Sequence, residues 1–127
     1  MPIIIECSPS DLYALFESHT MSSGMTKEIP GGASIRLGRM GMETKSLPQD
    51  TYTHIYAYAT LIPIELRWAG EVVSQVAIGL ATSWLYDKLK GGDGKGHRMI
   101  RIRREMIEVT PENLTRVLRE SVEEQKP

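Results

Sequence analysis

The sequence contains a single cysteine, Cys7, and carries a formal net charge of only −1. One cysteine cannot form a disulfide within the chain. Because Cys7 stands in an apolar stretch, we interpret it as a small buried side chain rather than a reactive thiol. The near-zero charge excludes a global attraction to nucleic acid or acidic membranes and leaves only local patches. Residues 1–11 lack the basic and long apolar regions of an export signal, so we expect a cytoplasmic protein.

Signatures of catalysis and of metal binding are also lacking. The histidines His19, His54 and His97 lie far apart, and none has a second metal-ligating residue at the spacing that zinc sites use. The sequence has no nucleophile elbow and no HExxH motif. The glycine-rich turn at 91–96 follows a predicted helix, whereas a phosphate-binding loop precedes one. We therefore predict no catalytic residue, no cofactor and no metal, and an enzyme is the weakest class.

The composition is that of one folded domain spanning residues 1–127, with 41% hydrophobic and 24% charged residues. Residues 20–50 are the least regular part and contain several glycines and methionines, with a strand predicted over 33–39. Alternation predicts the clearest strand over 51–62. Its amphipathic face suits an interface and carries Tyr52, His54, Tyr56 and Tyr58.

The two ends of the chain resemble each other. Residues 4–18 align without gaps to residues 106–120, and each unit reads as a strand, a capped start and a helix. Ser8 and Thr110 occupy the predicted N-cap position, and a proline follows each of them. Two explanations stay open. Either the units arose by duplication, or each independently contains the same favourable capping pattern at the start of its helix.

Residues 63–90 form the longest apolar segment, and we predict that most of it is a helix. No formal charge occurs between 72 and 86, so the helix is apolar on all sides and is expected to be buried. The uncharged run is shorter than the ~20 residues that span a bilayer, which leaves a membrane-associated helix over 72–89 as an alternative. A small domain does not cover every side of such a helix, and an uncovered face would suit a partner or a second copy.

Together these patterns predict an α+β fold in the order β-α-β-β-α-β-α. The extended segment 97–109 changes the parity of its apolar residues near 103–105, which indicates a bulge or a tight turn and would split it into a hairpin. We expect a single-domain sandwich with a mainly antiparallel sheet packed on a buried central helix. A ferredoxin-like core with an added C-terminal helix fits this order.

The best local signal is a basic segment over 88–104. Its candidate partner-binding residues are Arg98, Arg101, Arg103 and Arg104, to which we add Tyr52, Tyr56 and Tyr58 from the tyrosine face. The arginines could bind an acidic protein partner or nucleic acid. Alternatively, they could form a solvated face that pairs with the acidic last helix.

The C-terminal half runs from an apolar helix through a glycine turn to the strands around Arg101–Arg103 and Ile107–Val109 and the helix from Pro111. This order resembles small accessory proteins of bacterial and phage conflict systems, without a diagnostic motif. The sequence thus favours a non-enzymatic protein-interaction module, a small cytoplasmic adaptor, inhibitor or accessory protein that forms a homo-oligomer. The alternatives are a nucleic-acid binder using 88–104 and a membrane-associated protein.

Overall fold

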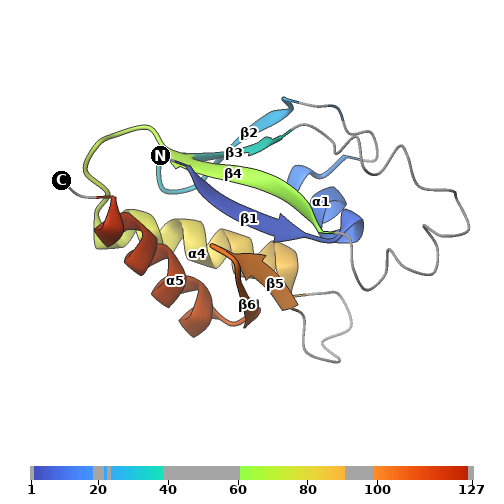
Figure 1. Ribbon diagram of the computed structural model, residues 1–127. Coiled ribbons are helices and arrows are strands. Elements are labelled where there is room, and N and C mark those ends of the chain that lie inside the picture. Colours follow the sequence, from blue (N-terminus) through green and yellow to red (C-terminus); the bar gives the residue numbers. More distant parts are fainter. Residues whose placement is uncertain (1, 19–21, 23, 39–60, 91–98, 126–127) are drawn as a thin grey trace, which may run out of the picture.

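The computed structural model describes residues 2–18, 22, 24–38, 61–90 and 99–125. These residues form six strands and three helices (Figure 1). In chain order they are β1 (Ile3–Cys7), α1 (Pro9–Phe16), β2 (Thr26–Ile29), β3 (Ala33–Leu37), β4 (Ile62–Trp68), α4 (Gln75–Leu89), β5 (Met99–Ile102), β6 (Glu105–Glu108) and α5 (Pro111–Glu124).

The six strands make one sheet in the order β2-β3-β4-β1-β5-β6, and every neighbouring pair is antiparallel. Within it, β3-β4-β1-β5 together with α1 and α4 form two interleaved split βαβ units, which is the ferredoxin-like arrangement. Strands β2 and β6 extend this core at its two edges, and α5 follows β6. The prediction of a single α+β domain with an antiparallel sheet packed on helices is confirmed.

The predicted helix over 63–90 is wrong in its first part, because Ile62–Trp68 is the strand β4. Buried and exposed residues alternate through this strand, and that period of two was hidden inside a longer apolar run. The helix α4 begins only at Gln75, where the Ser74 side chain accepts a hydrogen bond from the backbone of Ala77. The strand predicted over 51–62 lies outside the described residues apart from its last two positions.

The observed order contains two more strands than the predicted one. Strand β2 is a short edge strand whose centre carries Lys27 and Glu28, so its apolar signal is weak. The segment 97–109 is split into β5 and β6 by a tight turn, which is one of the two outcomes predicted there. The strand predicted over 33–39 is confirmed as β3.

One face of the sheet is apolar, and the three helices cover it. At its centre Ile5 of β1 is paired with Ile64 of β4 on one side and Ile102 of β5 on the other, and all three are fully buried. Cys7 is buried in the same cluster, as predicted. The helices contribute the buried residues Leu12, Leu15, Phe16, Ile78, Ala81, Leu85, Leu89, Leu114, Val117, Leu118 and Val122.

The similarity between the two ends of the chain extends to their structure. In α1 the Ser8 hydroxyl accepts a hydrogen bond from the backbone N–H of Asp11 at 3.3 Å, and in α5 Thr110 accepts one from Asn113 at 3.1 Å. Each helix follows a strand, begins with proline and lies on the apolar face of the sheet. Both strand–helix boundaries therefore fall where the capping pattern predicted them.

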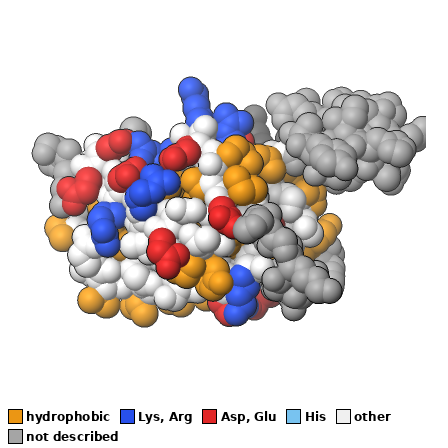
Figure 2. Space-filling model, turned by 90° about the horizontal axis from the view of Figure 1, so that it is seen from below, with side chains coloured by type: hydrophobic (Ala, Val, Ile, Leu, Met, Phe, Trp, Pro, Cys, Tyr) orange, Lys and Arg blue, Asp and Glu red, His pale blue; other side chains and the backbone are white. Residues whose placement is uncertain are grey.

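Helix α4 has a buried face and an exposed one. Its buried face packs under the sheet, between α1 on one side and α5 on the other. Its outer face is uncharged over most of its length, and Val76 and Leu80 stand open to solvent there. Figure 2 views the molecule from the side where α4 and α5 lie in Figure 1, and charged side chains of both signs are interspersed with uncharged surface.

A salt-bridge cluster joins α1, β2 and α4 at Glu17. Its carboxylate pairs with Lys27 at 3.0 Å and with Lys88, and both ammonium groups lie over the ring of Trp84, 5.6 and 5.9 Å from its centroid. The hydrogen bond from Lys88 and then that from Lys27 lower the pKa of Glu17 from 4.5 to about 2. The ionised carboxylate is thus favoured by the folded state.

Replacing Glu17 by Gln should lower stability in a pH-dependent way. A folded-state pKa below the unfolded one adds stability above about pH 4.5, and that contribution is lost as pH falls toward about 2. Urea unfolding at pH 7 should therefore separate the wild type from Glu17→Gln, and the gap should narrow toward pH 3. Glu28→Gln, at an exposed position of β2, is the control and should show no such convergence. A gap that stays constant with pH would contradict the role of the Glu17 carboxylate.

Removing the hydroxyl group of Thr82 in α4 should stabilise the protein. Its side chain is 2% exposed, and Oγ1 has no hydrogen-bond partner among the described residues. Thr82→Val keeps the shape and removes the unsatisfied group, so we expect the free energy of unfolding to rise by about 1 kcal/mol. Ser121→Ala is the matched contrast, because that buried hydroxyl donates to the carbonyl of Val117 at 2.8 Å. Equal effects of the two substitutions in urea titrations would refute this explanation.

Candidate interaction site at the β5–β6 turn

The turn between β5 and β6 is made of two arginines in a strained backbone conformation. Ile102 pairs with Glu105, which leaves Arg103 and Arg104 as a two-residue hairpin loop with φ of 54° and 66°. Positive φ at both positions is typical of a type I′ turn, which favours Asn-Gly. The left-handed conformation costs roughly 1–2 kcal/mol for a residue with a Cβ. Folding alone would therefore favour other residues here.

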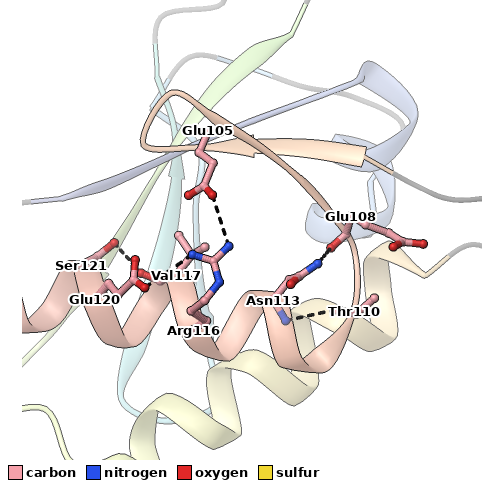
Figure 3. Close-up of polar contacts among 8 residues, drawn as sticks. All are labelled: Glu105, Glu108, Thr110, Asn113, Arg116, Val117, Glu120 and Ser121. Atoms are coloured by element: carbon pink, nitrogen blue, oxygen red, sulfur yellow. Dashed lines mark hydrogen bonds and ion pairs between the residues drawn. The ribbon is translucent and has the colours of Figure 1, made fainter.

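Helix α5 fixes the hairpin from the side of β6 (Figure 3). The guanidinium of Arg116 lies between Glu105 at 3.3 Å and Glu120 at 3.5 Å, so it ties the start of β6 to the helix. At the other end of β6, the side-chain amide of Asn113 donates to the backbone carbonyl of Glu108 at 3.0 Å. The hairpin is thus held at both ends of β6 by the helix that follows it.

The turn itself is attached to β1 and to the end of α5. The backbone N–H of Arg103 donates to the carbonyl of Ile4 at 3.3 Å, which continues the pairing of β5 with β1. The side chain of Arg103 forms an ion pair with Glu124 in the last turn of α5. Three segments that are distant in sequence therefore converge at this end of the sheet.

A hollow of about 610 Å³ lies where these segments meet. Part of its wall is apolar, with Ile3 buried and Ile4 36% exposed. Arg104 is one of the lining residues, and it is exposed and without an ion pair to any described residue. The hollow is lined by Pro2, Ile3, Ile4, Glu6, Arg103, Arg104, Ser121, Glu124 and Gln125.

Four of the five cations of the basic segment that the structure describes lie in ion pairs. Lys88 pairs with Glu17 and Lys90 with Asp87, while Arg101 lies 3.8 Å from Glu6 of β1 and Arg103 pairs with Glu124. One of the three interpretations of the basic segment was pairing with the acidic last helix, and Arg103 is paired in this way. Among the arginines of the segment that the structure describes, only Arg104 has no ion pair with a described residue.

The structure brings only some of the predicted residues together. Arg103 and Arg104 share the hollow, and Arg101 lies on the adjacent strand, where it reaches toward Glu6 instead. The other predicted residues, Arg98, Tyr52, Tyr56 and Tyr58, lie outside the described residues. The sequence did not single out the other lining residues, which are Ile3, Ile4 and Glu6 of β1 and Glu124 of α5. Each of them looks like an ordinary surface or core residue. The resemblance between residues 4–18 and 106–120 is the sequence signal that could have placed β1 and α5 near the same hairpin.

Cys7, the single cysteine, is chemically inert in the fold. Burial raises the pKa of the Cys7 thiol to about 12, so the thiol stays protonated. Within the described ranges, no three His, Cys, Asp or Glu side chains are placed to hold a metal ion. Among the helices that the structure describes, none is long and apolar enough to cross a membrane.

Comparison with known proteins gives no match, either to a protein-family model, to a curated protein or to a solved structure. The turn and the hollow combine a strained backbone, the ion pairs around it and Arg104, which has no ion pair among the described residues.

Replacing the two arginines by the residues that the turn favours should stabilise the protein. In Arg103→Asn/Arg104→Gly the relief of left-handed strain exceeds the loss of one exposed ion pair, so the free energy of unfolding should rise by about 1 kcal/mol. Urea titration measures the difference. Arg104→Lys keeps both the charge and the strain and should leave stability unchanged. A loss of stability in the double variant would mean that the arginines serve the fold.

Proposed function

We propose that this chain is a non-enzymatic protein-interaction module, a small cytoplasmic adaptor, inhibitor or accessory protein. It binds an acidic segment of another protein at the β5–β6 turn. The observation that carries the proposal is the position of Arg104. Arg104 has no ion pair with any residue that the structure describes, it lines the hollow, and its backbone conformation costs free energy. Backbone strain of this kind persists where the surrounding structure enforces it and is typical of binding sites.

The hollow supplies the two kinds of contact that a peptide needs. Arg104 offers planar donors that match a carboxylate in a bidentate geometry. The exposed side of Ile4 and the neighbouring Pro2 offer apolar contact beside it. An acidic residue next to an apolar one is therefore the sequence that this surface fits. The ion pair between Arg103 and Glu124 keeps the turn in place while Arg104 binds.

Acids around the hollow favour a discrete carboxylate over a continuous polyanion. Glu6 and Glu124 lie in the same lining as Arg103 and Arg104. Glu124 pairs with Arg103, and Glu6 pairs with Arg101 on the adjacent strand. A phosphate backbone would bring several negative charges close to these carboxylates and would be repelled by them. The acidic protein partner is for this reason preferred to nucleic acid as the ligand class.

The test is selection of peptides on the immobilised protein from a random display library, followed by affinity measurement. Selected peptides should be rich in Asp or Glu next to an apolar residue. Arg104→Glu should weaken their binding by about tenfold or more, since attraction becomes repulsion. Arg119→Glu makes the same change of charge on the exposed side of α5, away from the hollow lining, and is the matched control.

Each other result argues against the proposal. Peptides without acidic residues, or equal loss in Arg104→Glu and Arg119→Glu, would exclude the turn as the binding site. Binding of a single-stranded oligonucleotide that falls steeply with salt, together with no peptide enrichment, would assign the surface to nucleic acid instead.

A further inference from the structure

The edge of β1 that faces the hollow carries a backbone donor that the described residues leave open. The carbonyl of Ile4 accepts a hydrogen bond from the backbone N–H of Arg103 at 3.3 Å. In an antiparallel ladder the N–H and the carbonyl of one residue point to the same neighbouring strand, so the N–H of Ile4 faces this edge too. No hydrogen bond joins that N–H to a described residue. An open strand edge of this kind pairs readily with an extended ligand.

The edge is open because the β5–β6 hairpin turns away before the start of β1. The register of β1 with β5 ends where Ile5 pairs with Ile102. Arg103 follows, and its left-handed φ of 54° turns the chain toward β6. The hollow lies beyond this point, between the start of β1 and the end of α5, which are found at the same end of the molecule in Figure 1. A segment bound there lies beside β1 and in line with β5.

The turn at Arg103 limits the direction in which such a segment can lie. An antiparallel segment reaches the N–H of Ile4 only with a residue placed opposite Ile4, and Arg103 already occupies that position. In a parallel pair, one residue beside Ile3 can donate to the carbonyl of Pro2 and accept from the N–H of Ile4. The next residue of that segment would run into Arg103. A segment parallel to β1 therefore has to end beside Ile3.

The end of a parallel segment at this position is a C-terminus. Its carboxylate takes the place of a peptide carbonyl at the N–H of Ile4, and a hydrogen bond to an ionised acceptor is stronger than one to a neutral carbonyl. Arg103 and Arg104 line the same hollow, so positive charge lies beside the terminal carboxylate. Glu124 compensates only Arg103 among these two. The charge of Arg104 thus remains available to an acidic side chain of the same segment.

We infer, on the basis of the function proposed above, that the segment bound at the hollow is the C-terminal end of its protein. The segment lies parallel to β1, and its terminal carboxylate accepts a hydrogen bond from the backbone N–H of Ile4. An Asp or Glu side chain close to that end binds Arg104. An internal acidic segment would have to continue through the position of Arg103, so the turn selects chain ends over internal sequences.

Three forms of one acidic peptide, selected from a library with free C-termini, test this inference by calorimetric titration of the full chain. The first form has a free C-terminus, the second a C-terminal amide, and the third added glycines followed by a free C-terminus. The first should bind about tenfold more tightly than the other two, because only its carboxylate reaches the N–H of Ile4. The glycine-extended form keeps the net charge, which separates the position of the carboxylate from its charge. Acetylation of the N-terminus is the control and should leave the affinity unchanged.

The amide of Ile4 gives a second readout, on the protein itself. In the isotope-labelled chain, the free acid should shift the Ile4 amide resonance and slow its hydrogen exchange, because the N–H gains an acceptor. The amide of Thr26 in β2, at the opposite edge of the sheet, is the control and should not respond. Ile4→Pro removes the donor and should abolish the preference for the free acid. Glu28→Pro, at an exposed position of the edge strand β2, is the matched control and should retain it.

The outcomes separate this inference from the proposed function. Equal affinities of the free acid and the glycine-extended form, both weakened by Arg104→Glu, would overturn the terminal carboxylate and leave the proposed function standing. An unchanged Ile4 amide on binding of the free acid would overturn it as well, whether or not Ile4→Pro folds. Failure of every acidic peptide to bind would overturn the proposed function and, with it, the assignment of the chain end.

Discussion

Burial of one apolar sheet face beneath three helices is the constraint on which the structure depends. The branched side chains of Ile5, Ile64 and Ile102 stand side by side on that face and are fully buried. Each fully buried aliphatic side chain of this size contributes about 1.5–3 kcal/mol relative to exposure. Every helix must therefore turn its apolar side to the sheet, and its polar or surplus apolar side faces outward. The positions of the charges and of the exposed residues follow from that orientation.

The same constraint determines how the cations are distributed. Because β1, β5 and α5 converge at one end of the sheet, arginines from the hairpin meet acids from both other elements, as in Arg101 with Glu6 and Arg103 with Glu124. Exposed ion pairs contribute little to stability, but they remove positive charge from the surface. Arg104 is left at the tip with its charge uncompensated among the described residues. Of the described cations in the basic segment, Arg104 is thus the one that is left without an ion pair.

Two surfaces of the molecule carry features that folding of a single chain does not explain. At the β5–β6 turn, arginines occupy a left-handed conformation that Asn and Gly adopt more readily. On α4, Gly79 and the exposed residues Val76 and Leu80 occupy a helix whose buried side is otherwise well packed. Local choices that oppose the fold are expected where a sequence serves binding.

Local pattern in the sequence was sufficient for the fold class and for several boundaries. Ser8 and Thr110 determine where α1 and α5 begin, because a cap and a following proline act within a few residues. The change of parity near Arg103 likewise indicated the turn. The helix predicted from residue 63 was wrong because an apolar run contains no marker that separates a buried strand from a buried helix. Only the pairing of β4 with β1 and β3 decided that point.

The candidate site could be predicted only in part for a related reason. The sequence by itself determined that arginines would gather near residues 98–104, and that a helix with an uncharged outer side would precede them. Only the tertiary structure decided which described arginine is left without an ion pair, because the partners Glu6 and Glu124 are far from the arginines along the chain. It also decided which side of α4 is exposed, because the helix is apolar all round and only packing between sheet, α1 and α5 distinguishes its faces. Properties set by neighbours a few residues away were readable, whereas those set by contacts between distant segments required the fold.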